Sequence, residues 1–211
     1  MTEVFILKDV EKFNDELFNK IKTALPKWRR AQIDERADES DKKRMALAYF
    51  LLKFALKKVF GVEDVKEPKL NEYKKPYFED SQIHFNVSHS KDAVAVAVSD
   101  GEVGVDVESF LRYNEDKAYL TCTKSEIEKI NKAKTPSVEF IKIWTKKEAV
   151  GKYLGKGVDR KLLFSECEKE FLTVTRAYKS CALTVCYGKK NEKVLRPTIA
   201  TVSIKDLLKF E

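Results

Sequence analysis

The chain has 211 residues, which is enough for one large domain or two small ones, and either can bury a core. Charged residues make up 36% of the chain and apolar residues 43%, a composition that argues against disorder, and no run approaches the ~20 apolar residues of a membrane span. The formal net charge of +7 favours acidic or polyanionic partners. Net charge alone does not decide whether the partner is a nucleic acid, a nucleotide or an acidic protein.

The cysteines and the first residues give expectations about chemistry and compartment. The four cysteines include no C-x-x-C pair, and with only two histidines a zinc site is not expected. The segment from Met1 to Asp9 is too short and too acidic for a signal peptide. We therefore expect a cytoplasmic protein with reduced thiols and no membrane partner.

The first sixty residues predict a strand followed by helices. Residues 4–7 are typical of a strand, and apolar spacing over 10–25 predicts a surface helix that ends at Pro26. The basic run 27–30 that follows is a solvated turn or an anion contact. A helix capped by Ser40 and ended by Gly61 is apolar nearly all round, so we expect it to be central.

Arg44 lies in the first turn of that central helix, where the helix dipole does not favour a cation. An anion held there together with Lys42 and Lys43 would explain it, and plain surface charge is an equal alternative.

The middle of the chain contains two β-branched runs, 93–98 and 103–107, separated by a turn with Asp100-Gly101. This pattern predicts a hairpin of two central strands. Just before it, Ser88-His89-Ser90 follows a short strand and forms a candidate anion cradle. A serine nucleophile is not expected, because the chain here lacks a G-x-S-x-G elbow.

Asp106 and Glu108 stand two residues apart on the second run, so their side chains share a face of the strand about 6–7 Å apart. Two acids on a largely apolar strand repel each other and resist burial. A divalent cation would offset both effects, and Mg²⁺ favours oxygen ligands. The alternative is a strand end whose acids face water.

Two helices are predicted after the strands. Thr123 and Glu126 form a capping-box pattern, which gives Glu126 a capping role, and Pro136 restarts the chain into a helix from about 138 to 154. One stripe of that helix carries Ile141, Trp144 or Thr145, Glu148 and Lys152. After Trp144 the residues of this stripe are charged, whereas the residues of a helix face buried in the core would stay apolar. A Glu–Lys pair on the protein surface would give the same pattern.

In the last third of the chain, apolar and polar residues alternate in the pattern that is typical of β-strands. Residues 171–175, 181–186 and 198–202 predict an antiparallel meander, and 204–208 predict a short helix. Helices followed by strands thus occur twice. We expect an α+β protein of two similar lobes, with residues 1–101 forming the N-terminal lobe and 102–211 the C-terminal lobe that carries the metal site.

Three motifs in order resemble the signature set of one family. They are Phe85-Asn86-Val87-Ser88-His89-Ser90, Gly104-Val105-Asp106-Val107-Glu108, and the run from Trp144 to Lys152. With Lys75-Pro76 in front of them, they are similar to the motifs of the Sfp-type 4′-phosphopantetheinyl transferases. The resemblance implies a pseudodimer of two α+β lobes, with antiparallel sheets packed against helices and coenzyme A in the cleft between the lobes.

The resemblance also implies roles for individual residues. Asp106, Glu108 and Glu148 would hold Mg²⁺, with Mn²⁺ as an alternative, on the pyrophosphate that Lys152 contacts. Phosphate or nucleotide contacts would come from Lys75, Ser88 and His89, and more loosely from Arg44 with Lys27 or Arg30. Glu126, Glu148 and Lys152 are the expected catalytic residues, and Glu126 is the preferred base for the incoming serine.

Two positions depart from the family pattern. Lys74 stands where glycine is expected before Lys75, and Gly151 lies inside a helix at a cost near ~1 kcal/mol.

The implied reaction transfers the 4′-phosphopantetheine arm of coenzyme A to a serine of an acidic acyl or peptidyl carrier protein, and releases 3′,5′-ADP. We expect a monomeric enzyme that does not act on nucleic acid. The alternatives are a Mg²⁺-dependent nucleotide phosphohydrolase, which would use water instead of the serine, and a basic nucleic-acid-binding protein. The latter leaves the three acids unexplained.

Overall fold

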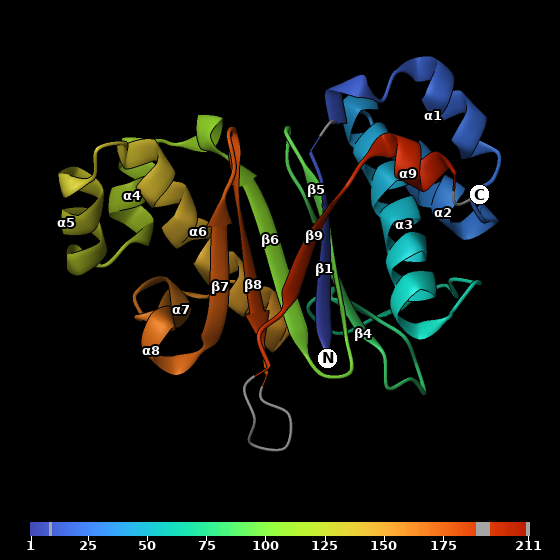
Figure 1. Cartoon of the computed structure of the whole chain (residues 1–211). Coiled ribbons are helices and arrows are strands. Elements are labelled where there is room, and N and C mark those ends of the chain that lie inside the picture. The colour runs from blue at the N-terminus through green and yellow to red at the C-terminus, as the bar shows by residue number, and fades with distance from the viewer. Residues whose placement is uncertain (9, 189–194, 210–211) are drawn as a thin grey trace.

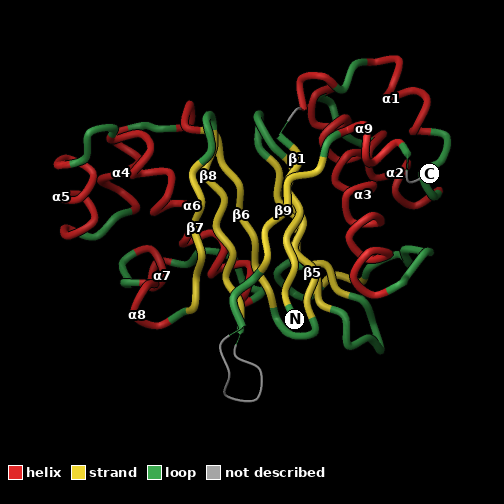
Figure 2. The backbone as a smooth tube through the Cα atoms, viewed as in Figure 1, coloured by secondary structure: helices red, strands yellow, loops and turns green. Residues whose placement is uncertain are grey.

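The computed structural model describes residues 1–8, 10–188 and 195–209. Two sheets lie face to face in the middle of the molecule, and helices cover the outer face of each sheet (Figures 1 and 2). The α+β class with antiparallel sheets and packed helices is therefore confirmed, apart from one parallel strand pair described below. Equivalence of the two halves, which a pseudodimer requires, stays a prediction.

The described strands form two main sheets and a small ribbon. The first sheet has the order β4-β5-β1-β9, the second has the order β6-β8-β7, and β2 pairs with β3. The strands are β1 (Thr2–Leu7), β2 (Lys69–Leu70), β3 (Pro76–Tyr77), β4 (His84–His89), β5 (Val94–Ser99), β6 (Val103–Ser109), β7 (Leu172–Ala177), β8 (Cys181–Tyr187) and β9 (Thr198–Val202).

The helices gather on the two outer faces, and none in the described part of the chain is long and apolar enough to cross a membrane. The α-helices are α1 (Asp15–Lys22), α2 (Lys27–Asp34), α3 (Glu39–Phe60), α4 (Glu115–Thr121), α5 (Lys124–Lys132), α6 (Pro136–Leu154), α7 (Arg160–Leu163), α8 (Cys167–Glu170) and α9 (Ile204–Leu208), with short 3₁₀ turns η1 (Val10–Lys12) and η2 (Phe110–Arg112).

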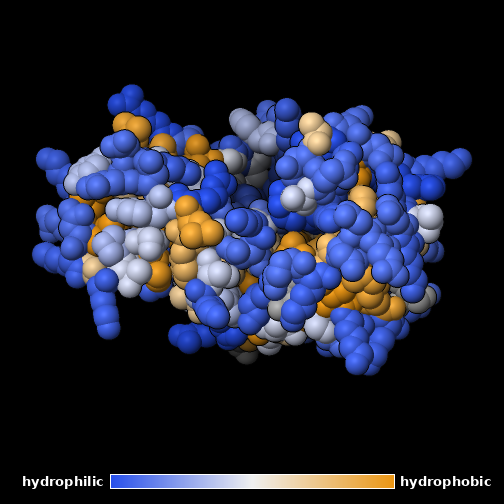
Figure 3. All heavy atoms as spheres, turned by 90° about the horizontal axis from the view of Figure 1, so that it is seen from above, coloured by the Kyte–Doolittle hydropathy of each residue, from blue (hydrophilic) through white to orange (hydrophobic). Residues whose placement is uncertain are grey.

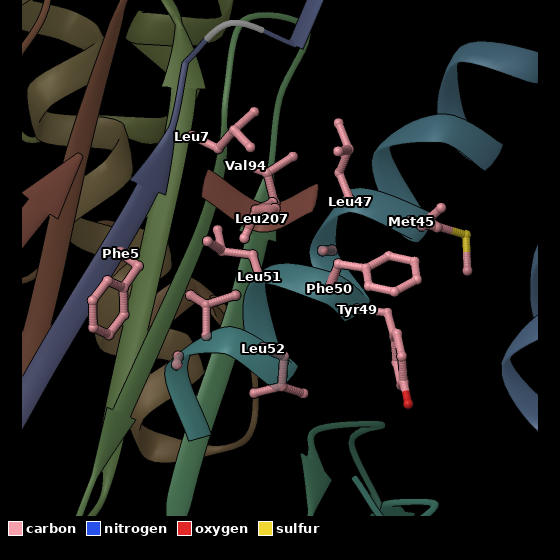
Figure 4. Packing of buried hydrophobic residues seen from close by; sticks show 14 of the residues in the cluster. Phe5, Leu7, Met45, Leu47, Tyr49, Phe50, Leu51, Leu52, Val94 and Leu207 are labelled. Atoms are coloured by element: carbon pink, nitrogen blue, oxygen red, sulfur yellow. The ribbon is translucent and has the colours of Figure 1, made fainter. Parts of the chain in front are cut away.

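Strand alternation divides the core into separate layers. On β1, Phe5 and Leu7 point toward α3, whereas Val4 and Ile6 point toward the second sheet. The valines of β5 also point toward α3, as Val94 does in Figure 4. The alanines of β5 point toward the second sheet. Because successive side chains of a strand alternate between its faces, a strand buried on both faces must be apolar throughout.

The central helix α3 begins earlier than the sequence predicts. Its N-cap is Asp38, whose carboxylate accepts a hydrogen bond from the Asp41 amide at 2.6 Å, so the predicted cap at Ser40 is wrong. Gly61 ends the helix with φ 69°, a left-handed conformation that glycine adopts at little cost. The basic run that begins at Lys27 is the start of α2 and not a turn.

The predicted hairpin of β5 and β6 is wrong. The two strands belong to different sheets, and the turn around Gly101 carries the chain from one sheet to the other. β5 pairs with β1 and β4, whereas β6 pairs with β8. Facing sheets bury the valines of one strand against the alanines of the other, which an in-plane hairpin could not do.

The predicted C-terminal meander is also wrong in its last strand. β7 and β8 pair antiparallel, but β9 leaves them and pairs in parallel with β1 in the first sheet. The helix α9 then contributes Ile204 and Leu207 to the core beneath α3 (Figure 4). Residues 198–208 thus pack with the elements formed by residues 1–101. β9 thereby covers the edge of β1 that β5 does not.

The approach of α6 to β6 depends on Gly104. A Cβ atom at this position would lie 2.1 Å from the carbonyl oxygen of Ala149 and 2.4 Å from the amide nitrogen of Tyr153. Such distances are far inside van der Waals contact, so only glycine lets the two backbones come this close. The contact places the middle of α6 directly over the face of β6 that carries the acids.

We expect Gly104→Ala to push α6 away from β6 and to lower the free energy of unfolding by about 1–3 kcal/mol, as overpacking does. Each kcal/mol lowers Tm by roughly 2–4 °C in a chain of this size. A thermal melt followed by circular dichroism measures the change.

Gly101→Ala is the matched control, because nothing lies within 4 Å of a Cβ built there. Equal melting temperatures for the two variants would show that the close approach at Gly104 contributes nothing to stability.

Candidate active site

A cleft of about 330 Å³ opens where β4 and β6 end, between the two sheets and α6. Figure 3 views the molecule from this end, where hydrophilic residues dominate the surface and a recess lies between the two halves. The residues that line the cleft include Ser88, His89, Asp106, Glu108, Glu148 and Lys152. The structure thus brings six of the sequence-predicted site residues to one place.

Asp106 is the most constrained acid of the cleft. Its Oδ1 accepts hydrogen bonds from the Ser88 hydroxyl at 2.8 Å and the Lys152 ammonium at 2.7 Å. Its Oδ2 is buried and has no hydrogen-bond partner in the described part of the chain. A buried carboxylate oxygen without a partner is costly, so the site lacks a donor or a cation at this atom.

Two side chains of β4 hold β6 in place across the gap between the sheets. The Asn86 side-chain oxygen accepts a hydrogen bond from the Val105 amide at 2.8 Å, and the Ser88 hydroxyl accepts one from the Val107 amide at 3.2 Å. On the edge of β6 that pairs with no strand, two backbone amides therefore donate to side chains instead of a neighbouring strand. Ser88, which also accepts from Lys152 at 3.0 Å, is already fully engaged.

Glu108 is also paired with a cation. Its carboxylate accepts a hydrogen bond from Arg112 on η2 at 2.9 Å and one from the Ser109 amide at 2.9 Å. Burial raises the pKa of Glu108, and the hydrogen bond from Ser109 opposes that shift. Arg112 lines the cleft and stays largely exposed to solvent.

Glu148 lies on the face of α6 that also presents Trp144 and Lys152 to the cleft. Burial, followed by the neighbouring charge of Asp106, raises its pKa, while Lys152 and Lys117 act in the opposite direction. Thr145 does not share this face: it is fully buried, and its hydroxyl lies 2.9 Å from that of Thr184 on β8.

The three acids line one cleft but do not converge on one point. Within the described ranges, no three histidine, cysteine, aspartate or glutamate side chains are arranged so that they could hold a metal ion together. Instead, Lys152 and Arg112 neutralise Asp106 and Glu108. The donor set nevertheless fits a hard cation, because it consists of carboxylate oxygens and one of them, Asp106 Oδ2, is buried without a partner.

His89 connects the cleft to the N-terminal part of α3. Its Nε2 lies 4.0 Å from a carboxylate oxygen of Asp41, which is 3.7 Å from Arg44. Burial lowers the pKa of His89, the nearby charges of Arg44 and Lys152 lower it further, and Asp41 opposes them. Arg44 also lies 3.6 Å from Asp38, so two carboxylates offset the unfavourable helix dipole.

Within the basic run of α2, the half-buried Arg29 bonds to the neighbouring helix α3. Its guanidinium donates to the Met45 carbonyl at 2.9 Å and to Gln32 at 3.0 Å, which ties α2 to α3. Burial lowers the pKa of Arg29. Lys27 and Arg30, the residues that the sequence favoured, lie on the same short helix but do not line the cleft.

Lys75 lies at the opposite end of β6 from the cleft. Its ammonium donates to Glu102 at 2.6 Å and to the Tyr153 carbonyl at 3.3 Å, beside a separate groove of about 640 Å³. Lys74 before it adopts φ 66°, a left-handed conformation like the one that a glycine takes easily. The substitution at this position therefore strains the backbone, at a cost of order 1–3 kcal/mol.

Glu126 also lies outside the cleft. It completes the predicted capping box with Thr123, and its carboxylate accepts a hydrogen bond from Lys147 at 2.6 Å. Lys147 is buried and also donates to the carbonyls of Thr121 and Leu163. This ammonium thus has three acceptors and links α6 to the segments on either side.

Comparison with known proteins identifies related proteins. Residues 102–194 match the model of the 4′-phosphopantetheinyl transferase superfamily. The chain is 31% identical over 162 residues to the 4′-phosphopantetheinyl transferase gsp of Aneurinibacillus migulanus, which covers 75% of this chain and 68% of the relative. The chain belongs to the 4′-phosphopantetheinyl transferase superfamily. A 4′-phosphopantetheinyl transferase of Bacillus subtilis is 29% identical over 125 residues, 57% of this chain and 55% of that protein.

This transferase departs from its family pattern at Gly151, and packing gives the reason. A Cβ at Gly151 would lie 2.6 Å from the carbonyl carbon of Gly157 and 2.7 Å from its oxygen. The loop after α6 folds back onto the helix there, with the Gly157 amide donating to the Gly151 carbonyl at 3.2 Å. Glycine at this position lowers the stability of the helix, but it allows the loop after α6 to pack closely against the helix.

Sequence reasoning missed four cations around the transferase site: Arg29, Arg112, Lys117 and Lys147. Arg112 stands four residues after Glu108, a spacing that could have indicated the pair if the segment had been read as a turn of helix. Lys147 sits next to Glu148 in the third motif, but only burial reveals its role. Arg29 and Lys117 carry no sequence signal that distinguishes them from solvated residues.

We expect Lys147→Met to lower the free energy of unfolding by about 3–5 kcal/mol, because it leaves Glu126 and two carbonyls without their donor. The double variant with Glu126→Gln should lose less than the sum of the two single changes, since the partners interact. Urea unfolding measures both.

Lys142→Met on the same helix is the control. Lys142 is 38% exposed and pairs with Glu139 at 3.5 Å, so its removal should cost less than about 1 kcal/mol. Similar losses for Lys142→Met and Lys147→Met would contradict a special role for the buried pair.

Proposed function

We propose that this transferase moves the 4′-phosphopantetheine arm of coenzyme A to a serine of an acyl or peptidyl carrier protein, with Mg²⁺ as the metal and Mn²⁺ as an alternative. The observation that carries the proposal is the meeting of β6 and α6 acids with Lys152 and Ser88 in one cleft. The family and both curated relatives support phosphopantetheine transfer.

Asp106, Glu108 and Glu148 are the residues that would hold the cation. When bound, the cation would neutralise charge on the pyrophosphate and stabilise the leaving phosphate. An arriving pyrophosphate offers oxygens to Lys152 and Arg112, the cations that otherwise pair with Asp106 and Glu108. Asp106 and Glu108 would then be free to hold the cation together with Glu148.

In the proposed reaction the carrier serine oxygen attacks the phosphorus that bears the pantetheine arm. The bond from that phosphorus to the oxygen of the leaving nucleotide breaks, and 3′,5′-ADP departs. Lys152 and His89 hold the phosphates, and Lys152 balances the charge that grows on the leaving group. Serine is a weak nucleophile at neutral pH, so a base must take its proton.

We assign the proton-accepting role to Glu148. It faces the cleft, and burial raises its pKa, which makes the carboxylate a better proton acceptor. A carboxylate that binds a cation through one oxygen still has a second oxygen for the proton. Glu126, the base favoured by the sequence, has its carboxylate engaged by Lys147 and Thr123, and we assign it a structural role.

We place carrier docking on η2 and α4, next to the cleft. These elements expose Leu111, Tyr119 and Leu120, whose exposed fractions are 77%, 55% and 72%. The same two elements contribute Arg112 and Lys117 to the cleft wall. An apolar surface beside cations suits an acidic carrier, because charge guides the encounter and apolar contacts add affinity that does not depend on salt.

The experiment that tests the proposed function is mass spectrometry of apo-carriers mixed with coenzyme A, Mg²⁺ and the transferase. A gain of ~340 Da on the carrier, the mass of the pantetheine phosphate arm, is expected. Asp106→Asn should reduce the rate by about 10²-fold or more, since it removes a carboxylate charge that would hold the cation and that pairs with Lys152.

Glu16→Gln, which changes an exposed acid on α1 away from the proposed docking elements, is the control and should transfer at the normal rate. Normal transfer by a folded Asp106→Asn variant would remove the metal assignment. Release of 3′,5′-ADP without any carrier would favour a nucleotide phosphohydrolase.

We further expect carrier binding to weaken as salt rises, because the chain carries a net charge of +7 and exposed charges are screened within about 10 Å at 0.1 M salt. The dissociation constant of an apo-carrier for the inactive Asp106→Asn variant, measured without coenzyme A, should rise several-fold between about 0.05 and 0.3 M salt.

Leu120→Ser separates the two contributions to docking. It should weaken carrier binding by a similar factor at every salt concentration, since the lost contact is apolar. A dissociation constant that does not depend on salt would contradict electrostatic docking.

A further inference from the structure

Lys117 lies in the wall of the cleft that α4 forms, opposite the acids. Its ammonium is 3.8 Å from the centre of the Trp144 ring, the distance of a close cation–π contact. Both side chains line the cleft. The indole thus fixes the position of a positive charge that belongs to none of the three sequence motifs.

The other two cations that emerge from α6 and η2 into the cleft have carboxylate partners. Lys152 pairs with Asp106 at 2.7 Å, and Arg112 pairs with Glu108 at 2.9 Å. For Lys117, no carboxylate oxygen of the described residues lies within 4.0 Å of the ammonium. Burial lowers its pKa, and the charges of Glu108, Glu148 and Asp106 act against that shift, so the ammonium faces the acids without contacting them.

The spacing along α6 defines what could bind between the two lysines. Trp144, Glu148 and Lys152 follow each other at four-residue intervals on one face, and the helix rise places the first and last about 12 Å apart. Lys117 stands at the Trp144 end and Lys152 at the other, with Glu148 between them. A diphosphate bound at the acids would therefore meet an ammonium on both sides.

We propose that Lys117 is a substrate-binding residue that contacts a phosphate oxygen of the coenzyme A pyrophosphate from the side opposite Lys152. Trp144 is its positioning residue, because the ring holds the ammonium over the cleft without neutralising it. The inference rests on the proposed function, since it takes coenzyme A as the ligand. It adds a contact from α4 to those that the motifs supply.

The experiment uses Trp144 as the reporter. The chain has two tryptophans, so in Trp28→Phe the remaining one reports on the cleft. Titration with coenzyme A and no carrier should change its fluorescence, and pantetheine, which lacks phosphate, should not. In this background Lys117→Met should weaken coenzyme A binding about tenfold by calorimetry and remove most of the fluorescence change, whereas Lys117→Arg should retain both within about threefold.

Lys132→Met is the matched control, because Lys132 is an exposed lysine of α5 that pairs with Glu128 at 3.8 Å. It should bind coenzyme A as the parent does. If Lys117→Met melts at a much lower temperature, Lys117→Gln replaces it in the same titration.

Coenzyme A binding by a folded Lys117→Met or Lys117→Gln variant with the parent affinity would overturn the proposal and leave Lys117 as a packing residue. The titration also separates the two proposals. Binding that depends on Lys117, together with failure to modify any carrier, would support this inference and contradict carrier modification. Modification of a carrier, together with a coenzyme A affinity that does not depend on Lys117, would support carrier modification and contradict this inference.

Discussion

The contact between the backbones of β6 and α6 sets the position of every reactive group in the cleft. Gly104 has no side chain, so the Ala149 carbonyl and the Tyr153 amide come within 2.1 and 2.4 Å of the place where a Cβ would stand. Glu148 and Lys152 each stand one residue before these two contact residues and line the cleft together with Asp106. The glycine at the start of the acidic strand is thus a geometric requirement of the acids that follow it.

Around that contact, charges are balanced in pairs. Lys152 and Arg112 neutralise the strand acids, and Ser88 fixes Asp106 while its oxygen also accepts the Val107 amide. A bound phosphate and a bound cation would bring charges of the same signs as the partners that they replace. Among the described residues, Asp106 Oδ2 is the buried carboxylate oxygen of this cleft that has no hydrogen-bond partner.

The helix α6 serves two purposes on two faces. Glu148 and Lys152 point into the cleft, whereas Lys147 points into the protein and engages Glu126 and two backbone carbonyls. A buried ammonium with three acceptors resists any shift or rotation of the helix, since each acceptor would lose its donor. Two adjacent residues therefore have different roles: Lys147 fixes the position of the helix, and Glu148 faces the cleft.

Sequence by itself determined the composition of the site and most of the elements that carry it. The spacing of Asp106 and Glu108, and of Trp144, Glu148 and Lys152, follows from strand and helix periodicity, which is a local property. Tertiary structure alone decided which sheet each strand joins, as the placement of β5 and β6 in different sheets and the pairing of β9 with β1 show. It also decided that Glu126 is engaged by Lys147 and that Lys117 lies over Trp144. Such pairings depend on which surfaces are buried together between residues far apart in the chain, and local periodicity carries no information about them.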